Sequence, residues 1–246
     1  MEKTPDQAVM EEELPENNIL EHIEALRFTL FKALGVYVFF CIPLWFFAPY
    51  LIKKLLAFAS PPGFKLHYFT LMEPFFTQLE LTAVGALLLA FPFILHFLWK
   101  FVAPALYPDE REKLRGPLAA SLLLAYGGAA FAVFCVIPAI IRFSVSFSME
   151  NLQPVIGVHS FISLLLMLIL ASSVIFQFPL ILHILLRLGL VTPEFLAEKR
   201  PIFVVVLFIC AAVFTPPDPA SQLMLALPAW GFFELAILWH RRKKSS

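Results

Sequence analysis

The chain has 246 residues, of which 60% are hydrophobic and only 15% are charged, with 18 basic and 18 acidic side chains. A soluble domain carries about a quarter charged residues, so this composition excludes an ordinary soluble globular protein. The zero net charge gives no reason to expect a nucleic-acid partner.

The charged residues are grouped between long apolar runs, which predicts a single all-α membrane domain. Residues 1–18 form an acidic extension that has neither the apolar core of a cleavable signal nor the arginines of a transit peptide. The first predicted span, Ala33–Ile52, has about the 20 apolar residues that a bilayer crossing needs. The amphipathic stretch Tyr50–Phe58 after it is predicted to lie at the membrane interface.

Three further runs follow. The second, Leu81–Trp99, starts near Pro74; the third lies between Arg115 and Arg142; the fourth runs from about His159 to Arg187. The last two are long enough that we expect them to tilt or protrude.

The fifth run, Ile202–Thr215, has only fourteen residues, about 21 Å of helix. Prolines at 216, 217 and 219 prevent one helix from continuing through this point. Asp218 is a good N-cap and Pro219 a good first residue for a last helix. Six spans are therefore expected within residues 19–241, the fifth and sixth forming a short hairpin before the basic tail 242–246. Thr192 and Pro193 similarly predict a brief helix before the fifth span.

Lysine and arginine predict the orientation. If both termini share one side, that side holds fourteen of the 18 basic residues, and the other side holds Lys53, Lys54, Lys65 and Arg142. The positive-inside rule then places both termini in the cytoplasm.

The sequence contains no catalytic motif, no phosphate-binding loop and no cluster of metal ligands, so neither enzyme activity nor a cofactor is expected. The three cysteines, Cys41, Cys135 and Cys210, are interpreted as small apolar side chains.

Two polar residues lie deep in apolar runs, where polar groups are costly. Gln177 lies about 15 Å inside Arg187 and shares a helix face with Ser163 and Ser173. It makes either a helix–helix hydrogen bond or a functional contact, and Pro179 should kink its helix. Glu234 is either paired locally or available to a partner. A small-solute or ion transporter using Gln177 and Glu234 is one hypothesis, and a membrane scaffold is another.

Several segments resemble the TatC family in order and spacing between Ile19 and Arg241: "EPFFTQLEL", "FPFILHFLWKFVAPALYPDER", "FCVIPAIIRF", "GLVTPEFLAEKRP" and "FTPPDPASQLMLALPAWGFFEL". The resemblance implies a concave, glove-like bundle in the inner membrane that receives twin-arginine signal peptides of folded proteins and uses the proton-motive force. Implied partners are single-span Tat subunits of the TatA and TatB type, and further copies in a receptor complex.

The resemblance also implies site residues. Signal-peptide binding falls on His22, Glu24, Arg27, Phe101, Glu110 and Arg111, and partner docking on Pro216, Asp218, Gln222 and Glu234. The family pattern H-[LI]-x-E-L-R-x-R-L is broken in "HIEALRFTL", where Ala25 replaces the glutamate and Thr29 the second base. Glu24, about 100° away round the helix, either compensates or leaves this surface without the carboxylate.

Overall fold

The computed structural model describes residues 15–60, 66–102, 115–146, 155–187, 189–214 and 219–244. Its long helices are α2 (Pro15–Ala59), α3 (Glu73–Val102) and α10 (Pro219–Lys244). Two spans are built from consecutive pieces: α4 (Arg115–Phe131), the π-turn η3 (Ala132–Val136) and α5 (Ile137–Ser146), then α6 (Val158–Ile175) and α7 (Phe178–Arg187). The short helices are α8 (Pro193–Glu198) and α9 (Arg200–Phe214).

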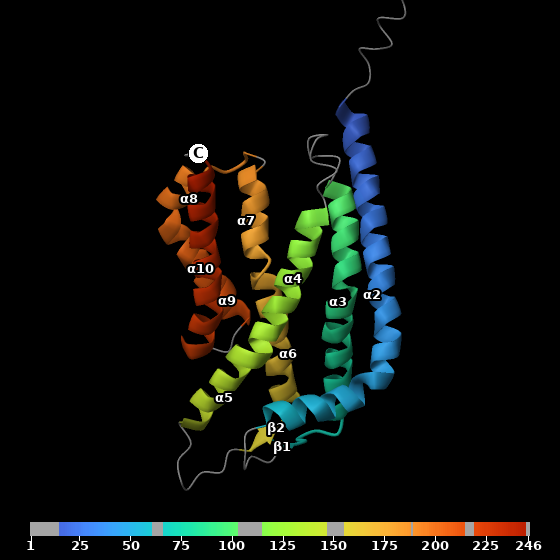
Figure 1. Cartoon of the computed structure of the whole chain (residues 1–246). Helices are drawn as coiled ribbons and strands as arrows, with labels where there is room; N and C mark the ends of the chain where they lie inside the picture. Colours follow the sequence, from blue (N-terminus) through green and yellow to red (C-terminus); the bar gives the residue numbers. More distant parts are fainter. Residues whose placement is uncertain are drawn as a thin grey trace, which may run out of the picture.

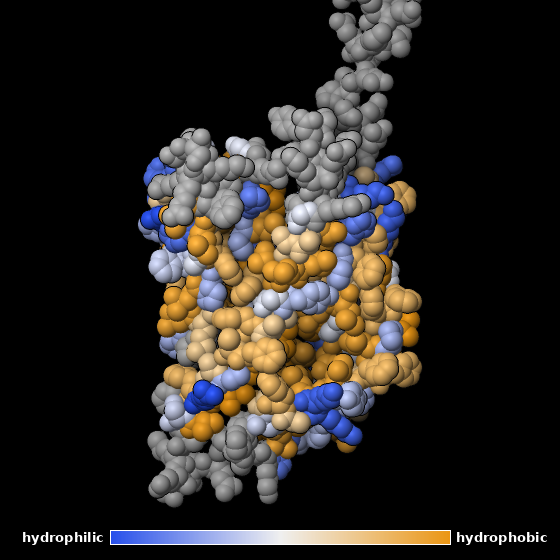
Figure 2. Space-filling view, in the orientation of Figure 1, coloured by the Kyte–Doolittle hydropathy of each residue, from blue (hydrophilic) through white to orange (hydrophobic). Residues whose placement is uncertain are grey.

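The helices have the length and composition of membrane spans. In the described part, five are long and apolar enough to cross a bilayer, and Arg200–Val213 is a shorter apolar helix. Figure 2 shows a broad apolar band between polar patches toward the two ends of the molecule. The all-α membrane architecture predicted from sequence is confirmed, whereas a sixth crossing by the 15-residue α9 stays a prediction.

Prolines explain where the two composite spans break. Pro179 has no N–H, and its ring disfavours a helical carbonyl four residues earlier, so α6 ends at Ile175 and α7 starts at Phe178. Pro138 acts in the same way on the preceding span. There the chain adds a π-turn, in which the Ile137 amide donates to the Ala132 carbonyl five residues back.

The helices pack into one bundle (Figure 1). Helix α3 contacts α2 and α6, α6 also contacts α4, and α10 contacts α7 and α9. The start of α2 and the end of α10 lie at one end of the molecule, which we call the terminal end. The last turns of α2, which include the predicted interfacial stretch, run across the opposite end.

Two short strands, which the sequence analysis did not predict, lie at that opposite end, which we call the cap end. Strands β1 (Leu66–His67) and β2 (Ile156–Gly157) pair in parallel and join the loop before α3 to the loop before α6. Buried Glu73 fixes this junction, because its carboxylate accepts hydrogen bonds from the amides of Phe69 (2.6 Å), Thr70 (3.3 Å) and His159 (2.9 Å).

Candidate functional site

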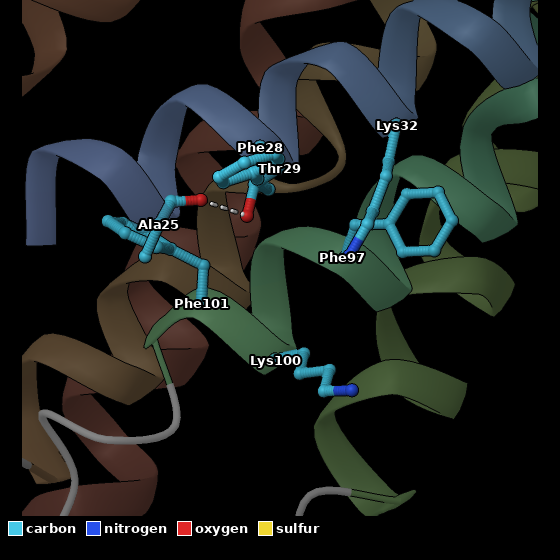
Figure 3. A pocket seen from close by; sticks show the side chains of 7 residues that line it. All are labelled: Ala25, Phe28, Thr29, Lys32, Phe97, Lys100 and Phe101. Carbon is cyan, nitrogen blue, oxygen red and sulfur yellow. Dashed lines mark hydrogen bonds between the residues drawn. The ribbon is translucent and has the colours of Figure 1, made fainter. Parts of the chain in front are cut away.

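A groove of about 240 Å³ opens between α2 and α3 near the terminal end. It is lined from α2 by Ala25, Phe28, Thr29 and Lys32, and from α3 by Phe97, Lys100 and Phe101. Figure 3 shows Lys32 reaching from α2 toward Phe97, whereas the Lys100 side chain extends on the side of α3 away from α2. The groove is therefore lined by aromatic side chains and by two lysines, of which Lys32 reaches across it.

The two departures from the family pattern both lie in this groove. Ala25 and Thr29 are one turn apart on α2, and the Thr29 hydroxyl donates to the Ala25 carbonyl at 2.8 Å. The hydroxyl is thus used within its own helix, and Ala25 brings no charge. Among the described lining residues the only charged ones are Lys32 and Lys100, so any carboxylate that receives a guanidinium here must come from elsewhere.

Of the residues predicted to bind signal peptides, Phe101 lines the groove. Glu24 and Arg27 are exposed on α2 and do not line it, and the Arg27 guanidinium lies 5.5 Å from the centre of the Phe31 ring. His22 belongs to α2, but its side chain lies outside the described part of the structure, as do Glu110 and Arg111. The structure therefore tests only part of this predicted set.

A second, larger cavity of about 450 Å³ lies between α3, α4 and the break between α6 and α7. Its walls are apolar except for Gln177 and Ser121. The Ser121 hydroxyl donates to Gln177 Oε1, and Gln177 Nε2 donates to the Ser121 carbonyl at 3.0 Å. Of the two interpretations of Gln177, the structure thus favours the helix–helix hydrogen bond, which joins α4 to the proline break.

Ser163 and Ser173 do not extend this pair into a continuous polar stripe. Ser173 donates to the Ile169 carbonyl at 2.8 Å within its own helix, whereas Ser163 donates to Glu80 on α3 at 2.7 Å. Ser163, Ser173 and Gln177 were predicted to share one polar helix face, but each has a different hydrogen-bond partner.

Polar contacts join helices α9 and α10. Glu234 pairs with Arg200 at 2.9 Å, so this deep carboxylate has a local partner. Gln222 Nε2 donates to the Phe208 carbonyl at 3.0 Å. Two of the four predicted docking residues are thus engaged inside the hairpin, while Pro216 and Asp218 lie outside the described residues.

Sequence reasoning missed a group of polar side chains at the cap end. Glu73, Thr77 and Glu80 lie on one face of α3, and they meet His159 and Ser163 at the start of α6. Their spacing of four and three residues along an otherwise apolar helix was the available signal, because residues so spaced share a helix face.

With this geometry in view, comparison with known proteins identifies the family. Residues 21–228 match the model of the family described as Sec-independent protein translocase protein (TatC). The chain belongs to the TatC family. It is 33% identical over 226 residues to TatC of Escherichia coli (strain K12), covering 91% of this chain and 88% of that protein. It is 33% identical over 235 residues to TatCy of Bacillus subtilis (strain 168), covering 93% and 92%.

A crystal structure of the twin-arginine translocase receptor TatC superposes with a TM-score of 0.80 at 30% identity, covering 88% of this chain and 96% of that one. This TatC-family chain is therefore a multi-pass membrane protein and a core subunit of the Sec-independent, or Tat, translocase. These matches do not support the transporter hypothesis, and its two polar residues already have partners inside the molecule.

Proposed function

We propose that this chain is the receptor for twin-arginine signal peptides and the core of a translocase that moves folded proteins across the membrane, driven by the proton-motive force. The observation that carries the proposal is the aromatic groove between α2 and α3, which contains Phe101 and lies next in the chain to residues 103–114. Glu110 lies in that segment, and a carboxylate that meets two guanidinium groups gains about 1.5–3 kcal/mol per charged hydrogen bond.

The proposed location is the inner (plasma) membrane, with both termini in the cytoplasm. Fourteen of the 18 lysines and arginines fall on the side of the termini under this topology. The start of α2 and the end of α10 lie at the same end of the structure, which supports the topology (Figure 1). The groove lies near this end, where a precursor arriving from the cytoplasm meets it.

The proposed partners are single-span Tat subunits of the TatA and TatB type, together with other copies of this chain in a receptor complex. Docking is proposed on the α9–α10 hairpin, near Gln222 and Glu234, and on Pro216 and Asp218 in the segment of the chain between the two helices. The short α9 supports this proposal, because a 15-residue helix spans about 22 Å, less than the usual hydrocarbon thickness. Gln222 and Glu234 would then act mainly by holding the hairpin in shape.

Photo-crosslinking at position 110 tests the receptor proposal. A crosslinker there, in the assembled complex, should label a precursor with a twin-arginine signal and label a matched twin-lysine precursor several-fold less. Equal labelling of the two precursors contradicts the receptor role. Copurification of the single-span subunits with an Asp218→Ala variant tests the docking proposal separately, because an undiminished yield argues against a docking role for Asp218.

A further inference from the structure

The larger cavity, between α3, α4 and the break between α6 and α7, has no part in the proposed receptor activity. Its wall on α3 runs from Phe91 to Trp99, which is about 12 Å of helix. Trp99 lies near the end of α3 at the terminal end, and Gln177 marks the depth that the cavity reaches. One leaflet of a bilayer contributes about 15 Å of hydrocarbon. The cavity therefore has about the length of one leaflet, the leaflet on the side of the termini.

The wall of this cavity presents hydrocarbon and a polar pair that is already satisfied. Ser121 and Gln177 use both the oxygen and the nitrogen of the Gln177 amide in bonds to each other. The other lining side chains are those of Leu, Ile, Val, Phe and Trp. A water molecule is held in a cavity only where it finds two or more polar partners, so the cavity favours an apolar occupant.

The cavity is accessible from the lipid. Among its lining residues, Val174 and Ile181 are 49% and 52% exposed, and both lie within the apolar span Val158–Leu186. A spanning helix with its side chains is about 10 Å across, so the same length of helix occupies on the order of 1000 Å³. The cavity holds about 450 Å³. An acyl chain is much narrower than a helix, so it is the occupant that fits this space.

A basic side chain lies where the headgroup of such a lipid would be. Lys100 follows Trp99 in the chain, and its side chain extends on the side of α3 away from α2 (Figure 3). The cavity lies on that side as well, because its described lining residues come from α3, α4, α6 and α7. Lys100 is exposed and has no ion pair among the described residues. Lysine near the membrane surface attracts anionic headgroups, and tryptophan is suited to the same level.

We propose that this cavity binds one acyl chain of an anionic phospholipid, with the headgroup phosphate at Lys100. The lipid comes from the leaflet on the side of the termini, and its hydrocarbon fills the space between α3 and the break between α6 and α7. The proposal does not depend on signal-peptide recognition, because the groove between α2 and α3 lies on the other side of α3.

Tryptophan fluorescence tests the acyl-chain site, because Trp99 is part of its wall. The full-length chain, with its other three tryptophans changed to phenylalanine, is titrated in detergent with phosphatidylglycerol whose acyl chains carry bromine, a quencher. We expect quenching that saturates at one lipid per chain. Leu95→Phe fills the cavity and should weaken this binding several-fold, whereas Leu89→Phe, on the same helix but outside the cavity, should not.

Ile184→Phe fills the cavity from α7 and gives a second variant if Leu95→Phe does not fold. Quenching that rises without saturation, or that is equal in the filled variants and in Leu89→Phe, shows only lipid around the protein and overturns the proposal. A photoreactive residue at position 181 that forms adducts with another polypeptide, in a chain that retains no phospholipid, overturns it as well.

Native mass spectrometry of the purified chain tests the headgroup contact. With identical acyl chains, phosphatidylglycerol should be retained several-fold more than phosphatidylcholine. Lys100→Gln should remove this preference, whereas Lys32→Gln, which changes the lysine that reaches across the other groove, should keep it. Equal retention of the two lipids by the wild-type chain, or the same preference in Lys100→Gln, overturns the role of Lys100.

Discussion

Two adjacent glycines in α4 have very different surroundings. A Cβ on Gly127 would meet nothing within 4 Å, whereas a Cβ on Gly128 would lie 2.6 Å from the Ser172 carbonyl oxygen and 2.9 Å from its carbon. Both of these atoms are backbone, so neither can move aside as the end of a side chain does. The absence of a side chain at Gly128 is what lets α4 cross α6 at close range.

The matched pair of variants Gly128→Ala and Gly127→Ala tests this crossing. We expect Gly128→Ala to lower stability by about 1–3 kcal/mol, because the added methyl forces the helices apart. Gly127→Ala should have no such cost. Thermal unfolding in detergent, followed by size-exclusion chromatography, compares the two proteins, and equal unfolding temperatures contradict the close crossing.

The groove at the terminal end allows a gain-of-function test. Ala25→Glu places a carboxylate in a groove whose described charged residues are Lys32 and Lys100. We expect this variant to bind a twin-arginine signal peptide about tenfold more tightly, since one charged hydrogen bond contributes about 1.5 kcal/mol or more. Ala25→Gln has the same shape without the charge and should leave binding unchanged. Fluorescence titration with labelled peptide measures both, and tighter binding by Ala25→Gln alone contradicts the electrostatic explanation.

At the scale of elements, the sequence predicted most reliably what is decided by neighbours in the chain. Helix α10 begins at Pro219, the Thr192 side chain caps α8 by accepting from the Phe195 amide at 3.2 Å, and Pro179 interrupts its span, all as predicted. These features depend on proline geometry and on capping within one turn. The same local rules predicted that α9 is short.

The features that were missed depend on residues far apart in the chain. Glu73 reaches His159 across 86 positions, and the β1–β2 pair joins two loops that carry no strong strand pattern. Within the candidate site, Phe101 could be placed in advance because the family resemblance supplied it. The partners of Gln177 and Glu234 could not, because a single sequence does not show which helices face one another.

The α9–α10 hairpin offers an element-scale prediction. The Arg200–Glu234 pair is partly buried, and Arg200 Nε has no described partner, so loss of one member leaves an uncompensated charge. Arg200→Met and Glu234→Leu should each lower the yield of folded protein several-fold. The double variant Arg200→Glu with Glu234→Arg should recover much of it. Size-exclusion profiles of the purified proteins measure the yield, and a swap worse than both single variants contradicts the pairing.

At the scale of the whole molecule, an apolar band separates a terminal end from a cap end (Figure 2). The proposed topology places position 110 and the basic tail on one side of the membrane and Lys54 on the other. The test uses single cysteines at positions 54, 110 and 243, in a chain whose three native cysteines are replaced by serine or alanine. We expect the cysteine at 54 to be labelled from outside the cell. The cysteines at 110 and 243 should be labelled only after permeabilisation. Labelling of 110 and 243 from opposite sides contradicts the common side of the termini.

Glu73 joins two loops that lie far apart in the chain, the loop before α3 and the loop before α6. Together with the β1–β2 pair, these contacts tie the start of α3 to the start of α6 at the cap end. The groove lies at the other end of α3, a helix of 30 residues, so the junction positions this helix without taking part in the groove.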